Sequence, residues 1–449
     1  MRSPPTGVKA FQLRTDRSQR LDTDAGLYAL DWWPGDQRST VHSTGNFLQA
    51  ISPSSAARDL LGLAVAVYCA DKVALRVDAP DGFTRDLELR IPVSDPERFV
   101  AAEEPLHRAL RFLTGDHWTL SFRPSSGRTR KKTAGTPADA VCLFSGGLDS
   151  LTGAIDLLAQ SVSLVLLGHH EGGLITHVQT DLARAITNRY GKTHARLRQL
   201  FLTPSVPHAG QARPLPQERE DTTRSRSLLF IAAGLALADS LGNQTPLYIP
   251  ENGFIGVNVP LVPARRGALS TRTTHPHFLA TLGEALTALQ LDTDAIKNPY
   301  RLHTKGEMLA TTQDTALLAE LAPRSVSCAH PTAGRWRKKP LGNCGYCWPC
   351  LIRRASMHQA GWDRADQYAW DALTDDTLLD PGTQTGASLR AALASLSGPD
   401  ERYAVLRNGP IPDGEAPDFD ALYRRGCEEL RTWLRSGGGP SLRKWLPAA

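Results

Sequence analysis

Apolar segments of strand length alternate with segments of helix length between residues 140 and 249. The strand-length segments are 140–144, 162–167, 195–202 and 247–249. Strands separated by helices predict a parallel sheet with helices on both faces, which is an α/β fold. Ligands of such sheets bind beyond the carboxyl ends of the strands. Functional side chains are therefore expected after Phe144, Leu167, Leu202 and Ile249.

The length of 449 residues predicts more than one domain. Near the start of the chain, one apolar stretch has the length of a buried helix, and two stretches alternate apolar and polar residues as strands do. They predict a domain that contains both helices and strands. A later stretch rich in Pro, Gly, Ser and basic residues is typical of a linker. The expected units are an N-terminal α+β domain (1–122), a basic linker (123–137), the α/β domain (138–325), a cysteine-bearing module (326–362) and a C-terminal helical tail (363–449).

The charge is nearly balanced, with 51 Lys and Arg against 46 Asp and Glu. A net charge of +5 is weak support for a nucleic-acid partner, because a basic face matters more than the bulk balance. The longest apolar run, 228–238, is too short to cross a bilayer, and the first residues lack the apolar core of a signal peptide. We therefore expect a cytoplasmic protein without a membrane partner.

The most specific motif of the α/β domain is Ser145-Gly146-Gly147-Leu148-Asp149-Ser150, which lies between a strand and a helix. Adjacent glycines let backbone amides approach an anion, and the helix adds the positive end of its dipole. The motif lacks the lysine of a Walker A loop, which favours pyrophosphate held as a leaving group. Asp149 then needs Mg²⁺ between its carboxylate and the phosphates. The alternative is an ordinary strand-to-helix turn.

Four of the seven cysteines follow the spacing C-x15-C-x2-C-x2-C: Cys328, Cys344, Cys347 and Cys350. Clustered cysteines in a reducing cytosol hold a metal more often than they form disulfides. Two x2 gaps place three thiolates on one knuckle, and the fourth completes a tetrahedron with no open position, so we expect structural Zn²⁺. An iron–sulfur cluster is the alternative.

This loop, followed by this cysteine pattern, resembles the QueC family, the 7-cyano-7-deazaguanine synthases. Further matching segments begin at Arg226, at Thr304-Lys305 and at Ser327-Cys328, and Arg353 matches an arginine that the family has after its last cysteine. The likeness covers residues 138–362. The N-terminal domain and the tail are additions, and such long variants resemble the QatC-type proteins of Qat anti-phage operons.

The resemblance implies a PP-loop ATP pyrophosphatase fold, similar to the adenine nucleotide alpha hydrolases. It implies an ATP-dependent ligase that uses Mg²⁺ and adenylylates 7-carboxy-7-deazaguanine, with release of pyrophosphate. Ammonia then gives an amide and later a nitrile, or an amine on a partner protein from the same operon takes the acyl group. Asp149, Lys305 and Arg226 are the candidate catalytic residues, and Arg353 is a candidate substrate contact.

The segment after the fourth strand lacks the Tyr-Pro-Asp-Cys-like sequence that we associate with deazaguanine recognition. Arg272, His275 and His277 lie on a loop expected at the strand ends, and they are candidates for contacting a distinct substrate.

Two other functions are compatible with the sequence. One is a tRNA-modifying PP-loop enzyme that binds RNA through the linker and the basic run 335–339. The other is a non-catalytic nucleotide-binding scaffold. The intact loop favours an enzyme, because a scaffold does not need Asp149.

Overall fold

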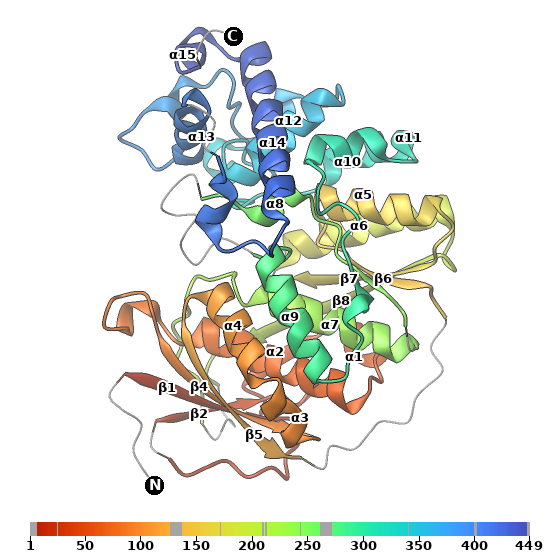
Figure 1. The fold of residues 1–449 in the computed structure, drawn as a ribbon, viewed down its shortest axis with the longest axis vertical. Coiled ribbons are helices and arrows are strands. Elements are labelled where there is room, and N and C mark those ends of the chain that lie inside the picture. Colours follow the sequence, from red (N-terminus) through yellow and green to blue (C-terminus); the bar gives the residue numbers. More distant parts are fainter. Residues whose placement is uncertain are drawn as a thin grey trace.

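The computed structural model of the protein describes residues 7–24, 26–125, 137–170, 172–208, 211, 213–242, 244–260, 272–339, 341–398 and 402–446. Most of the expected basic linker, residues 126–136, lies outside the described residues. Two β-sheets are stacked along the long axis of the molecule, and a helical tail lies at one end (Figure 1).

The larger sheet has six strands in the order β10-β9-β6-β7-β8-β3. All neighbouring pairs are parallel except β3 with β8. The strands are β3 (Val41–Thr44), β6 (Ala140–Leu143), β7 (Leu164–His170), β8 (Ala195–Pro204), β9 (Leu247–Tyr248) and β10 (Ile296–Lys297). The predicted parallel sheet and its four strands are confirmed. Chain order reverses direction between β6 and β9, so their carboxyl ends form the switch point where ligands bind in such sheets.

Helices cover both faces of this sheet, as the apolar strands require. Along β6, Ala140 and Cys142 pack toward one face, while Val141 and Leu143 pack toward the other. The first face is covered by α5 (Leu148–Ala159), α6 (Gly173–Tyr190) and α11 (Thr315–Leu321). The second face is covered by α2 (Ser55–Val73), α7 (Arg226–Leu241) and α9 (Pro276–Ala288).

The N-terminal sheet is parallel throughout, in the order β2-β1-β4-β5. Its strands are β1 (Val8–Arg14), β2 (Leu27–Asp31), β4 (Asp86–Val93) and β5 (His117–Pro124). This differs from the expected α+β arrangement. The helices α3 (Pro96–Ala101) and α4 (Glu103–Thr114) connect β4 to β5, and a helical crossover of this kind returns the chain parallel to the strand it left.

The first 122 residues share a core with the larger sheet. Strand β3 extends the edge of that sheet by pairing with β8, after which come α1 (Phe47–Ala50) and α2. Helix α2 is buried on nearly every side, which explains its continuous apolar sequence, and it packs against α7. The N-terminal segment is thus part of the scaffold that holds the larger sheet.

The C-terminal half continues with short helices around the cysteines and a longer one in the tail. These are α8 (Gly253–Val257), α10 (Lys305–Thr311), α12 (Trp348–Gln359), α13 (Ala387–Ser397), α14 (Ala416–Gly437) and α15 (Pro440–Arg443). Single-turn 3-10 helices are interspersed at Arg76–Asp78, Thr293–Ala295, Ala322–Arg324, Ala333–Arg337, Ala365–Gln367, Asp376–Leu379 and Ala404–Asn408. One apolar face of α14 is buried. No described helix has the length and apolar character needed to cross a membrane.

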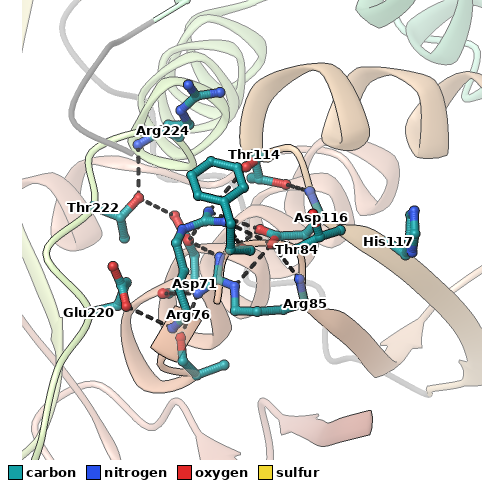
Figure 2. A network of polar contacts seen from close by, with 12 residues as sticks. Asp71, Arg76, Thr84, Arg85, Thr114, Asp116, His117, Glu220, Thr222 and Arg224 are labelled. Atoms are coloured by element: carbon teal, nitrogen blue, oxygen red, sulfur yellow. Dashed lines mark hydrogen bonds and ion pairs between the residues drawn. The ribbon is translucent and has the colours of Figure 1, made fainter. Parts of the chain in front are cut away.

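A buried ion network joins helix α2 to the start of strands β4 and β5 in the N-terminal sheet (Figure 2). The guanidinium of Arg85 bonds to Asp71 of α2 and to Asp116 before β5, each at 2.6 Å, and Arg76 pairs with Asp116 at 3.0 Å. All four side chains are buried. Two carboxylates facing two guanidinium groups in fork geometry satisfy each other's charges away from water.

Replacing Asp116 by Ala leaves Arg76 and Arg85 without their shared carboxylate, so we expect the unfolding free energy to fall by about 3–5 kcal/mol. Urea denaturation followed by circular dichroism measures this. Asp366→Ala is the control, because Asp366 forms an exposed pair with Arg364 and its loss should change little. Equal stability of the two variants would contradict the assigned role of the network.

Candidate functional site

Residues 144–147 form a tight turn between β6 and α5. Gly146 has φ +85°, a conformation that disfavours side chains, and a Cβ there would lie 3.1 Å from Val178 Cγ1 on α6. A Cβ on Gly147 would lie 3.1 Å from Ser327 Oγ. The backbone conformation at Gly146 favours glycine, and the close approach of Ser327 to Gly147 brings the start of α5 near the segment that precedes Cys328.

The amide hydrogens of this turn are directed at oxygen acceptors. Gly147 N–H donates to Ser145 Oγ at 3.3 Å, and Leu148 N–H donates to Ser327 Oγ at 3.0 Å. The hydroxyls of Ser145 and Ser150 are 3.2 Å apart. Amides in this arrangement at a helix N-terminus are suited to an anion, because the first amides of a helix have no partner within it and carry the positive end of the dipole.

A pocket of about 190 Å³ lies beside the turn, at the switch point between β6 and β9. It is smaller than the roughly 300–1,000 Å³ of typical ligand sites, so it has room for reacting groups rather than for a whole nucleotide. Its lining consists of Leu143, Ser145, Ser150, Arg226, Ser227, Phe230, Ile249, Pro250, Glu251 and Thr273.

Arg226, the first residue of α7, supplies the cation of the pocket. Its Nε donates to His169 Nδ1 and its Nη2 to the His169 carbonyl oxygen, both at 3.0 Å. Burial, followed by the charge of Arg226, holds the pKa of His169 well below its usual range, so this imidazole is neutral and can accept. His169 follows the strand residue Leu167, where functional side chains were expected, but the sequence did not single it out.

Asp149 and Lys305 are brought together, as the hypothesis of a shared site requires. Lys305 Nζ lies 2.5 Å from Asp149 Oδ1, and Asn252 Nδ2 donates to Asp149 Oδ2 at 2.7 Å. Lys305 already neutralises this carboxylate, so the arrangement does not fit Asp149 as a direct Mg²⁺ ligand. Within the described part of the chain, only the four cysteines bring three or more metal-binding side chains together.

Glu251, at the end of β9, is a pocket residue that the sequence reasoning missed. It accepts a hydrogen bond from the Thr274 hydroxyl. Burial, together with the nearby charge of Asp149, raises the pKa of Glu251 to about 7. A carboxyl group with this pKa can take up and release a proton near neutrality, and the rule that strand ends carry the chemistry was the signal that pointed to its position.

The two segments outside the α/β domain hold the site's cations in place. Asp71 of α2 accepts from Ser225 Oγ at 2.5 Å and from Ser225 N–H at 3.3 Å, directly before Arg226. Glu429 of α14 accepts from the hydroxyl of Thr304 and from Gly306 N–H, on either side of Lys305. Both acidic groups are buried, so each fixes the backbone beside a basic residue.

Three expected substrate contacts lie elsewhere. Arg272 stacks over Phe112 of α4 at 4.5 Å, and the ring of His275 is 4.7 Å from the same ring. Arg353 is buried and donates to Ser325 Oγ at 2.8 Å. The pocket at the switch point is lined by none of these three residues, and His277 does not line it either. Thr273 of the 272–277 segment does line this pocket, and its hydroxyl oxygen lies 2.9 Å from the hydroxyl oxygen of Ser227.

The four predicted cysteine ligands converge. Their sulfur atoms all lie within 4.8 Å of one another, with Cys328 and Cys347 at 3.8 Å and Cys344 and Cys350 at 3.9 Å. Four sulfurs around Zn²⁺ at about 2.3 Å would be about 3.8 Å apart, so the geometry fits a metal ion such as zinc. Backbone amides of Ala329, His330, Cys344 and Cys347 donate to these sulfurs. Such donors stabilise thiolates.

The cysteine module is bonded directly to the turn after β6. Besides the bond from Leu148 to Ser327, Val326 N–H donates to the Gly146 carbonyl oxygen at 2.9 Å. Asn343, beside Cys344, accepts from Ser327 N–H at 3.0 Å. The cysteine cluster and the turn after β6 are therefore both bonded to one short segment, residues 325–328.

The basic run proposed for RNA binding contributes an ion pair: Arg337 lies 2.8 Å from Asp375 and stacks on Trp370. No protein-family model matches the chain, and no solved structure matches it.

We expect one zinc ion per chain by elemental mass spectrometry of the purified protein. Cys347→Ser should release the metal and, because residues 325–328 then lose their anchor, speed hydrogen exchange at the amides of Gly147 and Leu148. Cys427→Ser is the control, because Cys427 lies in α14 outside the cluster and its replacement should leave the metal in place. Iron in place of zinc, or unchanged exchange without metal, would contradict this assignment.

Proposed function

We propose that the protein is an ATP-dependent ligase that transfers AMP to a carboxylate and then passes the acyl group to an amine. The observation that carries this proposal is the pocket at the β6–β9 switch point. There, Ser145 and Ser150 of the loop, the cation Arg226 and the carboxyl group of Glu251, whose pKa is raised to about 7, line one small space.

The turn's amides would hold the β and γ phosphates of ATP, with Mg²⁺ as the counter-ion that the nucleotide carries. A substrate carboxylate oxygen attacks the α phosphorus, the new O–P bond forms, and the bond to pyrophosphate breaks. Arg226 is positioned to balance the charge that develops on the phosphates, and Lys305 keeps Asp149 neutralised beside the loop. Catalysis is then chiefly positioning and charge stabilisation.

In the second half-reaction, an amine nitrogen attacks the acyl carbon and a C–N bond forms. The bond between the acyl carbon and the phosphate oxygen breaks, and AMP leaves with that oxygen and the bonding electron pair. The nitrogen must lose a proton, and Glu251 is the residue that we assign to receive it. Thr274 orients the carboxyl group by its hydrogen bond.

The substrate class rests on the resemblance to the QueC family and its QatC-like long variants. Under that proposal, the PP-loop fold activates 7-carboxy-7-deazaguanine, structural Zn²⁺ fills the four-cysteine cluster, and the acceptor is ammonia or an amine on a partner protein in anti-phage defence.

Incubation of the protein with ATP, Mg²⁺ and 7-carboxy-7-deazaguanine should yield AMP and pyrophosphate, separated by ion-exchange chromatography. Arg226→Gln should lower the rate about 100-fold, because a transition-state cation is lost. Arg364→Gln, at an exposed arginine paired with Asp366, is the matched control and should retain full activity. Formation of ADP and phosphate would overturn the proposal, and so would equal rates in the two variants.

The amine-transfer step should become faster as the pH rises through about 7, because Glu251 accepts a proton only as the carboxylate. Hydroxylamine serves as the amine, because it is a weaker base than an alkylamine and is mostly uncharged at neutral pH. Glu251→Gln should remove the pH dependence and lower hydroxamate formation about 100-fold, while pyrophosphate release persists. A pH profile that is the same in both proteins would exclude Glu251 as the base.

A further inference from the structure

A second pocket, of about 540 Å³, lies where three distant parts of the chain meet. Helix α4, the segment 272–277 and the 3-10 helix Ala404–Asn408 contribute to it. Its lining consists of Arg108, Arg111, Phe112, Arg272, His277, Leu406, Arg407, Asn408 and Gly409. Four of these residues are arginines and none is acidic. We propose that this pocket binds an acidic peptide segment of a protein partner.

The arginines of the pocket are only partly balanced by carboxylates. Arg108 pairs with Glu104 and Glu284 at the pocket's edge. Arg111 is exposed and has no ion pair within the described part of the chain. Arg272 donates to the Phe112 carbonyl oxygen, but its buried Nε has no hydrogen-bond partner among the described residues. A bound carboxylate would compensate this uneven charge.

The guanidinium of Arg272 is largely buried, and no carboxylate of the described residues pairs with it. Burial lowers the pKa of Arg272 to about 10, which means that its surroundings disfavour the charged form. A carboxylate within hydrogen-bond reach reverses this effect, because an opposite charge favours the ionised guanidinium.

The aromatic surface favours a peptide over a nucleic acid. Phe112 is the only benzene ring among the described residues that line the pocket. It is already covered by the Arg272 guanidinium at 4.5 Å and by the rings of His275 and His277 at 4.7 and 4.9 Å. Recognition of single-stranded RNA relies on open aromatic faces on which bases stack. Leu406, with 47% of its surface exposed, offers an apolar contact that suits a peptide with both acidic and apolar side chains.

This pocket and the pocket at the β6–β9 switch point are lined by consecutive residues of the chain. Arg272 lines one and Thr273 lines the other. An acidic segment held by Arg272 would lie against the same short chain segment that lines the pocket in which we propose the acyl group is activated. This role as the acceptor's docking site rests on the proposed function, whereas binding of the segment does not.

The test uses fluorescence anisotropy with the full-length protein and a dye-labelled peptide of glutamates around one leucine, without ATP. The same peptide with glutamines and an oligouridylate of equal length are the comparison ligands. We expect the glutamate peptide to bind best. Arg111→Glu should weaken it about tenfold or more, because a carboxylate replaces the unpaired cation. Arg364→Glu, the matched control at an exposed arginine outside the pocket, should leave binding unchanged.

The proposal is overturned if the glutamine peptide binds equally well, or if Arg111→Glu behaves like the control. Tighter binding of the oligouridylate would overturn it in favour of a nucleic-acid partner. Because the assay contains no ATP, a negative result is independent of whether AMP and pyrophosphate are formed in the activity assay.

Discussion

The two hydrogen bonds between residues 146–148 and residues 326–327 are the connection on which the site depends. Leu148 N–H bonds to Ser327 Oγ, and Val326 N–H bonds to the Gly146 carbonyl oxygen. They fix a glycine turn that could otherwise adopt many conformations, since glycine loses more backbone freedom on folding than any other residue. The turn is held to one conformation because residues 326–327 lead directly into Cys328, which the cysteine cluster immobilises.

The same principle explains why segments outside the α/β domain matter to the site. A basic side chain contributes to catalysis only if it is held in place before the substrate arrives. Asp71 holds the start of α7 beside Arg226, and Glu429 holds the start of α10 beside Lys305. The N-terminal segment and the tail therefore act as supports for the two cations, and removing either should disturb the pocket without touching its lining.

The features that follow from local pattern were predictable from the sequence. The strands β6 to β9, the turn before α5 and the convergence of the four cysteines were predicted, because alternation, glycine pairs and cysteine spacing act over short distances. The position of Arg272 was not predictable. It follows from the packing of α4 against α9, which places Phe112 beneath a guanidinium 160 residues later in the chain. The antiparallel edge strand β3 and the hydrogen bond between His169 and Arg226 are long-range contacts of the same kind.

The central claim is that the amides at the start of α5 hold the phosphates of ATP. A crystal structure of the protein with an ATP analogue that resists cleavage between the α and β phosphates tests it most directly. We expect the β and γ phosphates within hydrogen-bond distance of the amides of Asp149 and Ser150 in the first turn of α5, with the α phosphorus facing the pocket that contains Arg226 and Glu251. A triphosphate bound at another place on the molecule, with this turn unchanged, would contradict the claim.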